Sequence, residues 1–240
     1  MSLLNDIENF CEVNTTLYGF ANIQEYTHLF IEENLKKYKY AISIGINIPD
    51  DILDNLSQKD AEIKYLETYN KVNSKLDEIT KFLEGLIIDS GFNAKSVKAS
   101  EILPNNKLEG KLSHKMIARL SGLGWIGKSC LLITPHYGPR VRWATVLTDF
   151  ELPSNNTILK SRCNTCRLCV VNCPSNAFTG VEFDENDSRS TRYDAFKCYD
   201  HFAQLEEQGR PRLCGLCVKV CPWGLVNKNS RTKEDIIGQE

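Results

Sequence analysis

The sequence has no long hydrophobic run and no strong excess of either charge. No stretch of about 18 apolar residues occurs, which excludes a membrane-spanning helix. Residues 1–10 have neither a basic start nor an apolar core, so we expect no signal peptide and a cytoplasmic protein. A net charge of -2 gives no general attraction to nucleic acid, and 42% hydrophobic residues are too many for a disordered chain.

Histidine is scarce, whereas cysteine is abundant and unevenly placed. The four His residues show no metal-ligand spacing among themselves: His28, His114, His136 and His201. Eight of the ten Cys lie between Cys163 and Cys221. In a reducing compartment such density indicates metal binding rather than a disulfide-bonded fold. We expect the two outlying residues, Cys11 and Cys130, to be small buried side chains.

The spacing of the eight clustered Cys is specific. Cys163, Cys166, Cys169 and Cys173, with Pro174 after them, follow the pattern C-x2-C-x2-C-x3-C-P of two-cluster bacterial ferredoxins, in which the fourth Cys binds the other cluster. A second run, Cys214, Cys217 and Cys221 before Pro222, ends in the same C-x3-C-P pattern, and Cys198 completes its set.

Two 4Fe-4S clusters account for all eight thiols. We predict that one cluster takes Cys163, Cys166, Cys169 and Cys221, and that the other takes Cys173, Cys198, Cys214 and Cys217. Zinc in two four-Cys sites is the alternative, but zinc does not call for the crossed pattern. Two adjacent clusters would carry single electrons, and a partner protein or a second cofactor must turn those electrons into chemistry.

Apolar periodicity divides the chain into helices and strands. Helical spacing occurs at 2–13, 26–38, 60–90 and 112–120, and strand-like runs occur at 17–23, 40–48, 92–99, 131–134 and 141–147. This alternation predicts a layered domain of the α/β (α+β) class over residues 1–155. We expect a double-cluster ferredoxin-like domain at 156–228 and a polar tail at 229–240.

The middle of the chain is basic and contains a glycine-rich turn. Residues 107–142 hold seven basic residues and one acidic residue, which favours an anionic ligand or partner. The turn, Gly122 to Ser129, contains G-x4-G-K-S but follows a helix and precedes a strand, so it is not a nucleotide-hydrolysing P-loop. Its glycines would let backbone approach a large flat ligand, with Lys128 meeting an anionic group. A tight turn with Trp125 in the core is the alternative.

These motifs together carry a resemblance. The runs Gly122-Leu-Gly-Trp-Ile-Gly-Lys128 and Thr148-Asp-Phe-Glu-Leu152, with the Cys motifs and Trp223, resemble the epoxyqueuosine reductases. Residues 133–142 are similar to the matching segment of corrinoid reductive dehalogenases. The resemblance implies a cobalamin-reductase-like α/β domain beside the two clusters and a corrinoid reduced by the nearer cluster. It also implies an electron donor such as ferredoxin or flavodoxin. The residues it places beside the corrinoid are Gly122, Gly124, Gly127, Lys128 and Ser129.

The sequence also departs from those families. Epoxyqueuosine reductases carry a Val-Asp-Ser/Thr run whose Asp donates a proton, and the matching stretch here is Val97-Lys-Ala-Ser100. Their C-terminal helical repeats are missing, which with the lost Asp argues against a tRNA substrate. The dehalogenases usually carry an export signal, whereas we expect none in this sequence. Candidates for a general acid are Tyr137, His136, His114 and Glu101, each of which also has a structural or surface interpretation.

Three functions therefore compete. The first is a cobalamin-dependent reductase that acts on a small molecule or a modified nucleoside. The second is an electron-transfer iron–sulfur protein that feeds or reactivates a separate corrinoid enzyme and has no substrate of its own. The third is a homologue whose clusters mainly hold the last third of the chain together.

Overall fold

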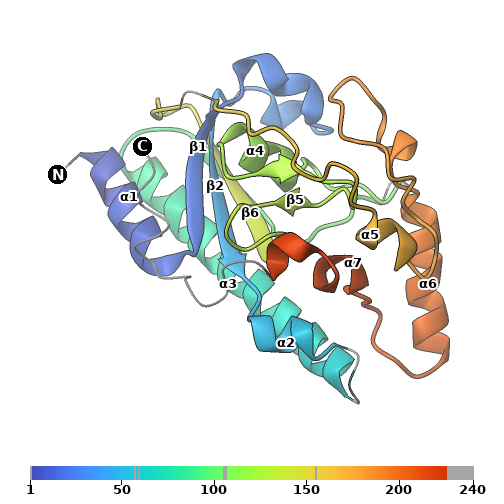
Figure 1. The fold of residues 1–240 in the computed structure, drawn as a ribbon. Coiled ribbons are helices and arrows are strands. Elements are labelled where there is room, and N and C mark those ends of the chain that lie inside the picture. The colour runs from blue at the N-terminus through green and yellow to red at the C-terminus, as the bar shows by residue number, and fades with distance from the viewer. Residues whose placement is uncertain (1, 57, 59, 105–106, 155, 226–240) are drawn as a thin grey trace.

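A computed structural model describes residues 2–56, 58, 60–104, 107–154 and 156–225 (Figure 1). The helices are α1 (Leu3–Asn14), α2 (Asp50–Asp54), α3 (Ala61–Asp89), α4 (His114–Leu120), α5 (Leu168–Val171), α6 (Ala195–Glu207) and α7 (Leu216–Lys219). The strands are β1 (Leu17–Asn22), β2 (Tyr40–Asn47), β3 (Ala94–Val97), β4 (Trp125–Ile126), β5 (Leu132–Ile133) and β6 (Val141–Thr148). The expected tail at 229–240 lies outside the described residues. No helix within the described ranges is long and apolar enough to cross a membrane.

A four-stranded antiparallel sheet forms the centre of the fold. Its strand order is β1-β2-β6-β3, and Ile42 of β2 lies opposite Val146 of β6. β6 therefore lies between β2 and β3 in the sheet, although it follows β3 in the sequence. Helices pack on this sheet in layers, which confirms the predicted fold class in its α+β form.

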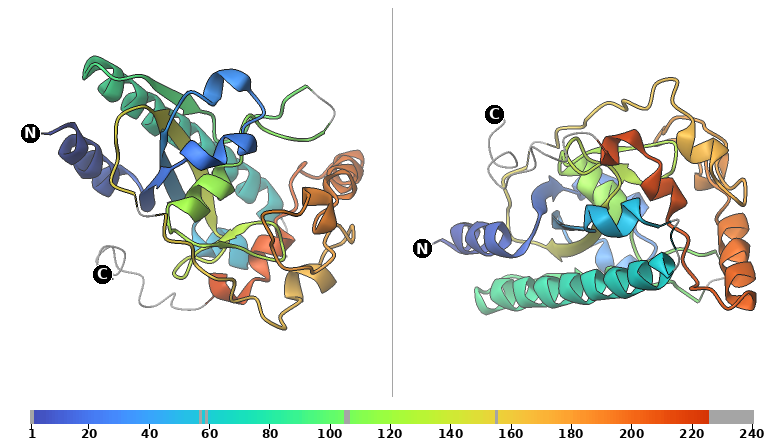
Figure 2. Two further views of the ribbon diagram at one scale, coloured as in Figure 1. Left: turned by 90° about the horizontal axis from the view of Figure 1, so that it is seen from above. Right: turned by 60° about the horizontal axis from the view of Figure 1, so that its bottom comes forward.

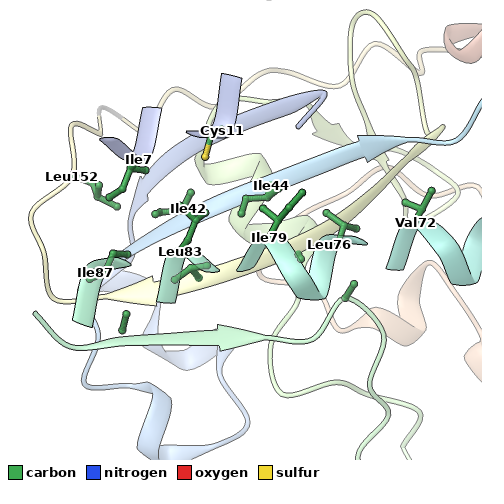
Figure 3. Close-up of a cluster of buried hydrophobic side chains, with 14 residues drawn as sticks. Ile7, Cys11, Ile42, Ile44, Val72, Leu76, Ile79, Leu83, Ile87 and Leu152 are labelled. Carbon is green, nitrogen blue, oxygen red and sulfur yellow. The ribbon is translucent and has the colours of Figure 1, made fainter. Parts of the chain in front are cut away.

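The central strands are buried on both faces, because helices cover both sides of the sheet. Their apolar runs are therefore continuous rather than alternating. On one face, Ile42 and Ile44 of β2 meet α3 and α1 (Figure 3). Helix α3 contributes side chains at helical spacing: Val72, Leu76, Ile79, Leu83 and Ile87. Gly91 follows this helix with a φ of +90°, the left-handed conformation that is typical of the residue just after a helix C-terminus.

The other face of the sheet packs against α4 and residues 24–38. Ile117 and Leu120 of α4 meet Ala41 and Leu147 of the sheet. The helix expected at 26–38 is instead two short 3-10 segments, Gln24–Leu29 and Glu33–Leu35. Tyr26 leaves the helical region with a φ of -110°, so the apolar spacing there serves to bury side chains against the sheet rather than to continue a helix.

The segment that carries the clustered Cys lies at one end of the sheet, where it contacts the β4–β5 hairpin (Figure 2). Gly124 is needed in this hairpin, because a Cβ there would lie 2.3 Å from the carbonyl oxygen of Ile133. The side chain of Asn156 donates to the carbonyl of Asn22 at 2.8 Å, which ties the start of the segment to β1. The division at residues 155 and 156 stays a prediction.

A buried arginine links three parts of this end of the molecule. Arg140 is fully buried, and its guanidinium pairs with Asp50 at 2.7 Å and with Asp54 at 2.8 Å, both on α2. Gly224 lies against the same guanidinium, and a Cβ there would lie 2.6 Å from Nε. Arg140 therefore fixes α2 and the end of the Cys segment to the turn before β6.

Candidate functional site

Four thiols from both Cys motifs line one small cavity, and we call Cys163, Cys166, Cys169 and Cys221 the first thiol set. Burial and the neighbouring Cys163 and Cys166 raise the pKa of Cys169 to about 11. Burial and Cys163 raise the pKa of Cys221 to about 11, although backbone N–H groups of Trp223 and Gly224 partly oppose this. Cys221 therefore lies with the first motif in space and with the second motif in sequence.

The other four thiols form the second thiol set: Cys173, Cys198, Cys214 and Cys217. Burial raises the pKa of Cys217 above its ordinary value, and Cys214, Cys198 and Cys173 raise it further. The pKa of Cys217 also responds to Cys169, so the two sets adjoin. The thiols thus group as the sequence spacing predicts, while their assignment as cluster ligands stays a prediction.

This environment suits bound iron. Thiols that are buried and that face one another resist ionisation, because each thiolate charge would repel the next. A bound cation reverses this and deprotonates its thiol ligands. The donor chemistry of both sets therefore fits iron–sulfur clusters. Among the described residues, no three His, Cys, Asp or Glu side chains are arranged to hold a single metal ion.

Local packing fixes the second thiol set in place. Gly215 has a φ of +76° at the start of α7, and a Cβ there would lie 2.4 Å from the ring of Tyr65. The glycine lets α7 pack closely on α3, which places Cys217 beside that buried ring. On α6, Cys198 accepts a hydrogen bond from the Tyr193 hydroxyl, which lowers the pKa of Cys198 against the larger raising effect of burial.

A large cavity of about 780 Å³ lies beside the second thiol set. Its walls come from the end of β3, the loop before α4, α4, the β5–β6 region and Arg189. Leu131 lines this large cavity and also packs in the hydrophobic cluster that contains Cys217. Lys115 lines it too, and its charge interacts with Cys217. The second thiol set is therefore next to the large cavity through these two residues.

The glycine-rich turn lies elsewhere. None of Gly122, Gly124, Gly127, Lys128 and Ser129 is among the described residues that line the large cavity. Lys128 and Ser129 instead line the small cavity with the first thiol set. The buried Lys128 Nζ donates to the carbonyl of Asn164 and, at 3.4 Å, to that of Cys166, and it pairs with Glu182 at 3.3 Å.

The four candidate acids separate into two pairs. Glu101 and His114 line the large cavity, whereas Tyr137 and His136 do not. Tyr137 is buried in the hydrophobic cluster beneath the β5–β6 turn. Glu101 pairs with Lys111 at 3.4 Å.

Both ring nitrogens of His114 are engaged. Nε2 lies 2.9 Å from the carbonyl oxygen of Lys98, which only accepts, so Nε2 carries the proton. Nδ1 then accepts from the Thr145 hydroxyl at 2.8 Å. Burial, with smaller effects from Arg142 and Lys115, lowers the pKa of His114 to about 4. His114 is therefore neutral near pH 7 and holds the Lys98 backbone at the cavity.

This His predicts an acid-dependent loss of stability. Because the folded-state pKa of His114 lies below its ordinary 6.5, the stability it contributes is complete above about pH 6.5. That stability falls as the pH decreases through about 4. Urea unfolding of the wild type and of His114→Gln between pH 4.5 and 7.5 checks this, since the difference between them should change over that window. A difference independent of pH would contradict the neutral assignment.

Sequence reasoning missed several residues of the large cavity. Lys115 counted only as part of the basic middle, and Arg189 comes from a distant segment. Neither residue has a periodic or motif signal, because they meet only through the packing of α4 and the Cys segment. The excess of basic residues at 107–142 was the one signal that pointed toward this region.

Comparisons with known proteins agree with this geometry. Residues 162–224 match the family described as 4Fe-4S double cluster binding domain. An epoxyqueuosine reductase of Synechococcus sp. is 33% identical over 112 residues, which are 47% of this chain and 34% of that protein. The chain spans about a third of the length of the first curated relatives it matches.

Two solved structures share the fold. A catabolic reductive dehalogenase matches with a TM-score of 0.70 and 20% identity, over 91% of this chain and 31% of the dehalogenase. The epoxyqueuosine reductase of Streptococcus thermophilus matches with a TM-score of 0.59 and 18% identity, over 94% of this chain and 67% of the reductase. The resemblance predicted from the motifs is thus confirmed: the chain is a relative of the epoxyqueuosine reductases with a 4Fe-4S double cluster binding domain, and it shares its fold with them and with a reductive dehalogenase.

Proposed function

We propose that this protein is an iron–sulfur oxidoreductase whose large cavity holds a corrinoid that acts on a small molecule or a modified nucleoside. The observation that carries this proposal is the closeness of the large cavity to the second thiol set. Leu131 lines the cavity and packs on the same hydrophobic cluster as Cys217, and Lys115 lines the cavity and interacts electrostatically with Cys217. Electrons that reach the second set would then lie close to a ligand in the cavity.

The walls of the large cavity fit a flat ligand of corrinoid type. They combine apolar side chains with a similar number of polar and charged side chains. The apolar residues that would hold such a ligand are Ile31, Val97, Leu112, Leu131, Leu132, Pro139, Val141 and Trp143. When bound, the clusters would supply single electrons and a corrinoid would supply a cobalt centre able to accept them.

The chain's own residues would control solvent and protons in this cavity. The apolar wall excludes water from one side of the ligand. His114 keeps its proton on Nε2, directed at the Lys98 carbonyl, and so does not offer it to the cavity. Glu101 is the other candidate acid that lines the cavity, and its carboxylate pairs with Lys111 at 3.4 Å.

The surface over the thiols suits an acidic electron donor such as a ferredoxin or flavodoxin. Segments 156–181 and 208–225, which carry seven of the eight clustered Cys, contain six basic residues and no acidic residue. Leu168 is exposed and also lines the small cavity of the first thiol set. A donor docked there would reach the first set before the second.

Anaerobic reconstitution with iron and sulfide, followed by titration with hydroxocobalamin, tests the proposal. We expect about eight iron and about eight sulfide per chain and a changed cobalt spectrum at micromolar corrinoid. Zinc in place of iron would refute the cluster assignment. Reducible clusters without any corrinoid spectral change would instead support the alternative, an electron-transfer protein for a separate corrinoid enzyme.

A further inference from the structure

We propose that the large cavity binds an anionic group, a carboxylate or a phosphate, carried by its ligand. This inference rests on the proposed function only in taking the large cavity as the ligand site.

The charge lining the large cavity is the first observation. Five basic side chains and two acidic side chains line it: Lys98, Lys111, Lys115, Arg142 and Arg189 against Glu101 and Glu109. The cavity is thus positive in a chain whose net charge is -2. The charge of Lys111 is already balanced, because Lys111 pairs with Glu101 at 3.4 Å and with Glu32 at 3.6 Å.

Three of the remaining cations, Lys115, Arg142 and Arg189, interact only with neutral groups. Lys115 Nζ donates to the carbonyl of Cys130 at 2.5 Å. Arg142 Nε donates to the Asn73 amide oxygen at 3.0 Å, and its guanidinium lies 4.2 Å from the centre of the Tyr69 ring.

Arg189, at the edge of the cavity, donates to the carbonyls of Lys107 at 2.6 Å and of Leu108 at 2.8 Å. In the part of the chain that the structure describes, no carboxylate lies within 4.0 Å of the side-chain nitrogens of Lys115, Arg142 or Arg189.

These cations also repel one another. Burial, and then the charges of Arg189 and Arg142, lower the pKa of Lys115, although Cys130 acts in the opposite direction. Burial, and then Arg142 and Lys115, lower the pKa of His114. Lys115 and Arg142 are partly buried, whereas Arg189 is exposed. Positive charges that gather in one cavity without a counter-charge favour an anion between them.

Lys98 completes this arrangement at the mouth of the cavity. Its side chain is exposed and lines the cavity directly after β3, while its carbonyl is held by His114. The backbone of Lys98 is therefore fixed while its ammonium group remains accessible to a ligand. Carboxylate and phosphate are the anions that such ammonium and guanidinium groups bind best.

A charge-matched pair of probes tests the inference on the reconstituted full chain. Benzoate and benzamide have similar shapes but differ in charge, and binding of each is followed by tryptophan fluorescence, because Trp143 lines the cavity. We expect benzoate to bind about tenfold more tightly than benzamide. We expect Lys98→Met to weaken benzoate binding about tenfold, with Arg189→Gln as a second variant. Lys71→Met, an exposed Lys on α3 outside the cavity, is the control.

Two corrinoids distinguish whether the anion belongs to the cofactor or to the substrate. If the anion belongs to the cofactor, Lys98→Met should weaken cobalamin, which carries a phosphate in its nucleotide, but not cobinamide, which lacks that nucleotide. If the anion belongs to the substrate, benzoate should bind in the presence of cobinamide. Equal binding of benzoate and benzamide, or benzoate binding unchanged in both Lys98→Met and Arg189→Gln, would overturn the inference. This result is independent of whether a corrinoid binds at all.

Discussion

Cys221→Ser is expected to remove the cluster encoded by the first motif, although Cys221 belongs to the second. Its thiol lines the same small cavity as Cys163, Cys166 and Cys169, and its pKa responds to Cys163 and Cys169. Iron content should fall from about eight to about four per chain, since a cubane that loses one thiolate ligand is destabilised. Iron analysis, with electron paramagnetic resonance of the reduced protein, measures the loss and identifies the surviving cluster.

The reciprocal variant makes the test specific. Cys173→Ser should remove the cluster held by the second thiol set, because Cys173 interacts with Cys198, Cys214 and Cys217. The two variants should therefore retain clusters with different spectra. Cys11→Ala, at a thiol buried in the core between α1 and the sheet, should keep full iron. Loss of the locally encoded cluster in either serine variant would refute the crossed assignment.

The sheet and the long helix were predictable because their patterns are local. A continuous apolar run identifies a strand buried on both faces, as in β2, and helical spacing over several turns identifies α3. The same rule misled at 26–38, since burial against a sheet also spaces apolar residues at three and four positions. No local pattern indicates that β6 inserts between β2 and β3, which depends on the assembled layers.

The thiol grouping was predictable for a different reason. The ferredoxin spacing encodes a long-range fact, that the fourth Cys crosses to the other cluster, so a local motif specifies a distant contact. No sequence motif of this kind specifies the large cavity. Its walls come from separate segments around 97–101, 108–115 and 131–143, with Arg189. Only the assembled fold brings Lys115 and Arg189 together.

The glycine-rich turn lies against the Cys segment, and its contact with a cofactor stays a prediction. Glycines followed by Lys128 are typical of an anion site, and that pattern predicts contact with a cofactor. In the fold, Gly127 lets the chain approach the Cys segment, and a Cβ there would lie 3.3 Å from Cys163 Sγ. Lys128 contributes its positive charge to backbone carbonyls at Asn164 and Cys166.

Lys128→Met is therefore expected to impair the first cluster rather than corrinoid binding. The substitution keeps a long unbranched side chain but leaves the carbonyls of Asn164 and Cys166, and the carboxylate of Glu182, without their donor. The loss of such charged hydrogen bonds costs roughly 2 kcal/mol. Because that cost falls on the loop between Cys163 and Cys166, iron should decrease from about eight toward about four per chain.

Corrinoid titration of the same variant separates the two roles of Lys128. Since Lys128 does not line the large cavity, the affinity for hydroxocobalamin should stay within about twofold of wild type, less than 1 kcal/mol. Lys71→Met, which removes an exposed charge on α3, should leave both iron and corrinoid affinity unchanged. Full iron with weakened corrinoid binding would restore the cofactor role that the motif predicts. Reduced iron with unchanged corrinoid affinity would show that Lys128 stabilises the first thiol set by donating to the carbonyls of Asn164 and Cys166.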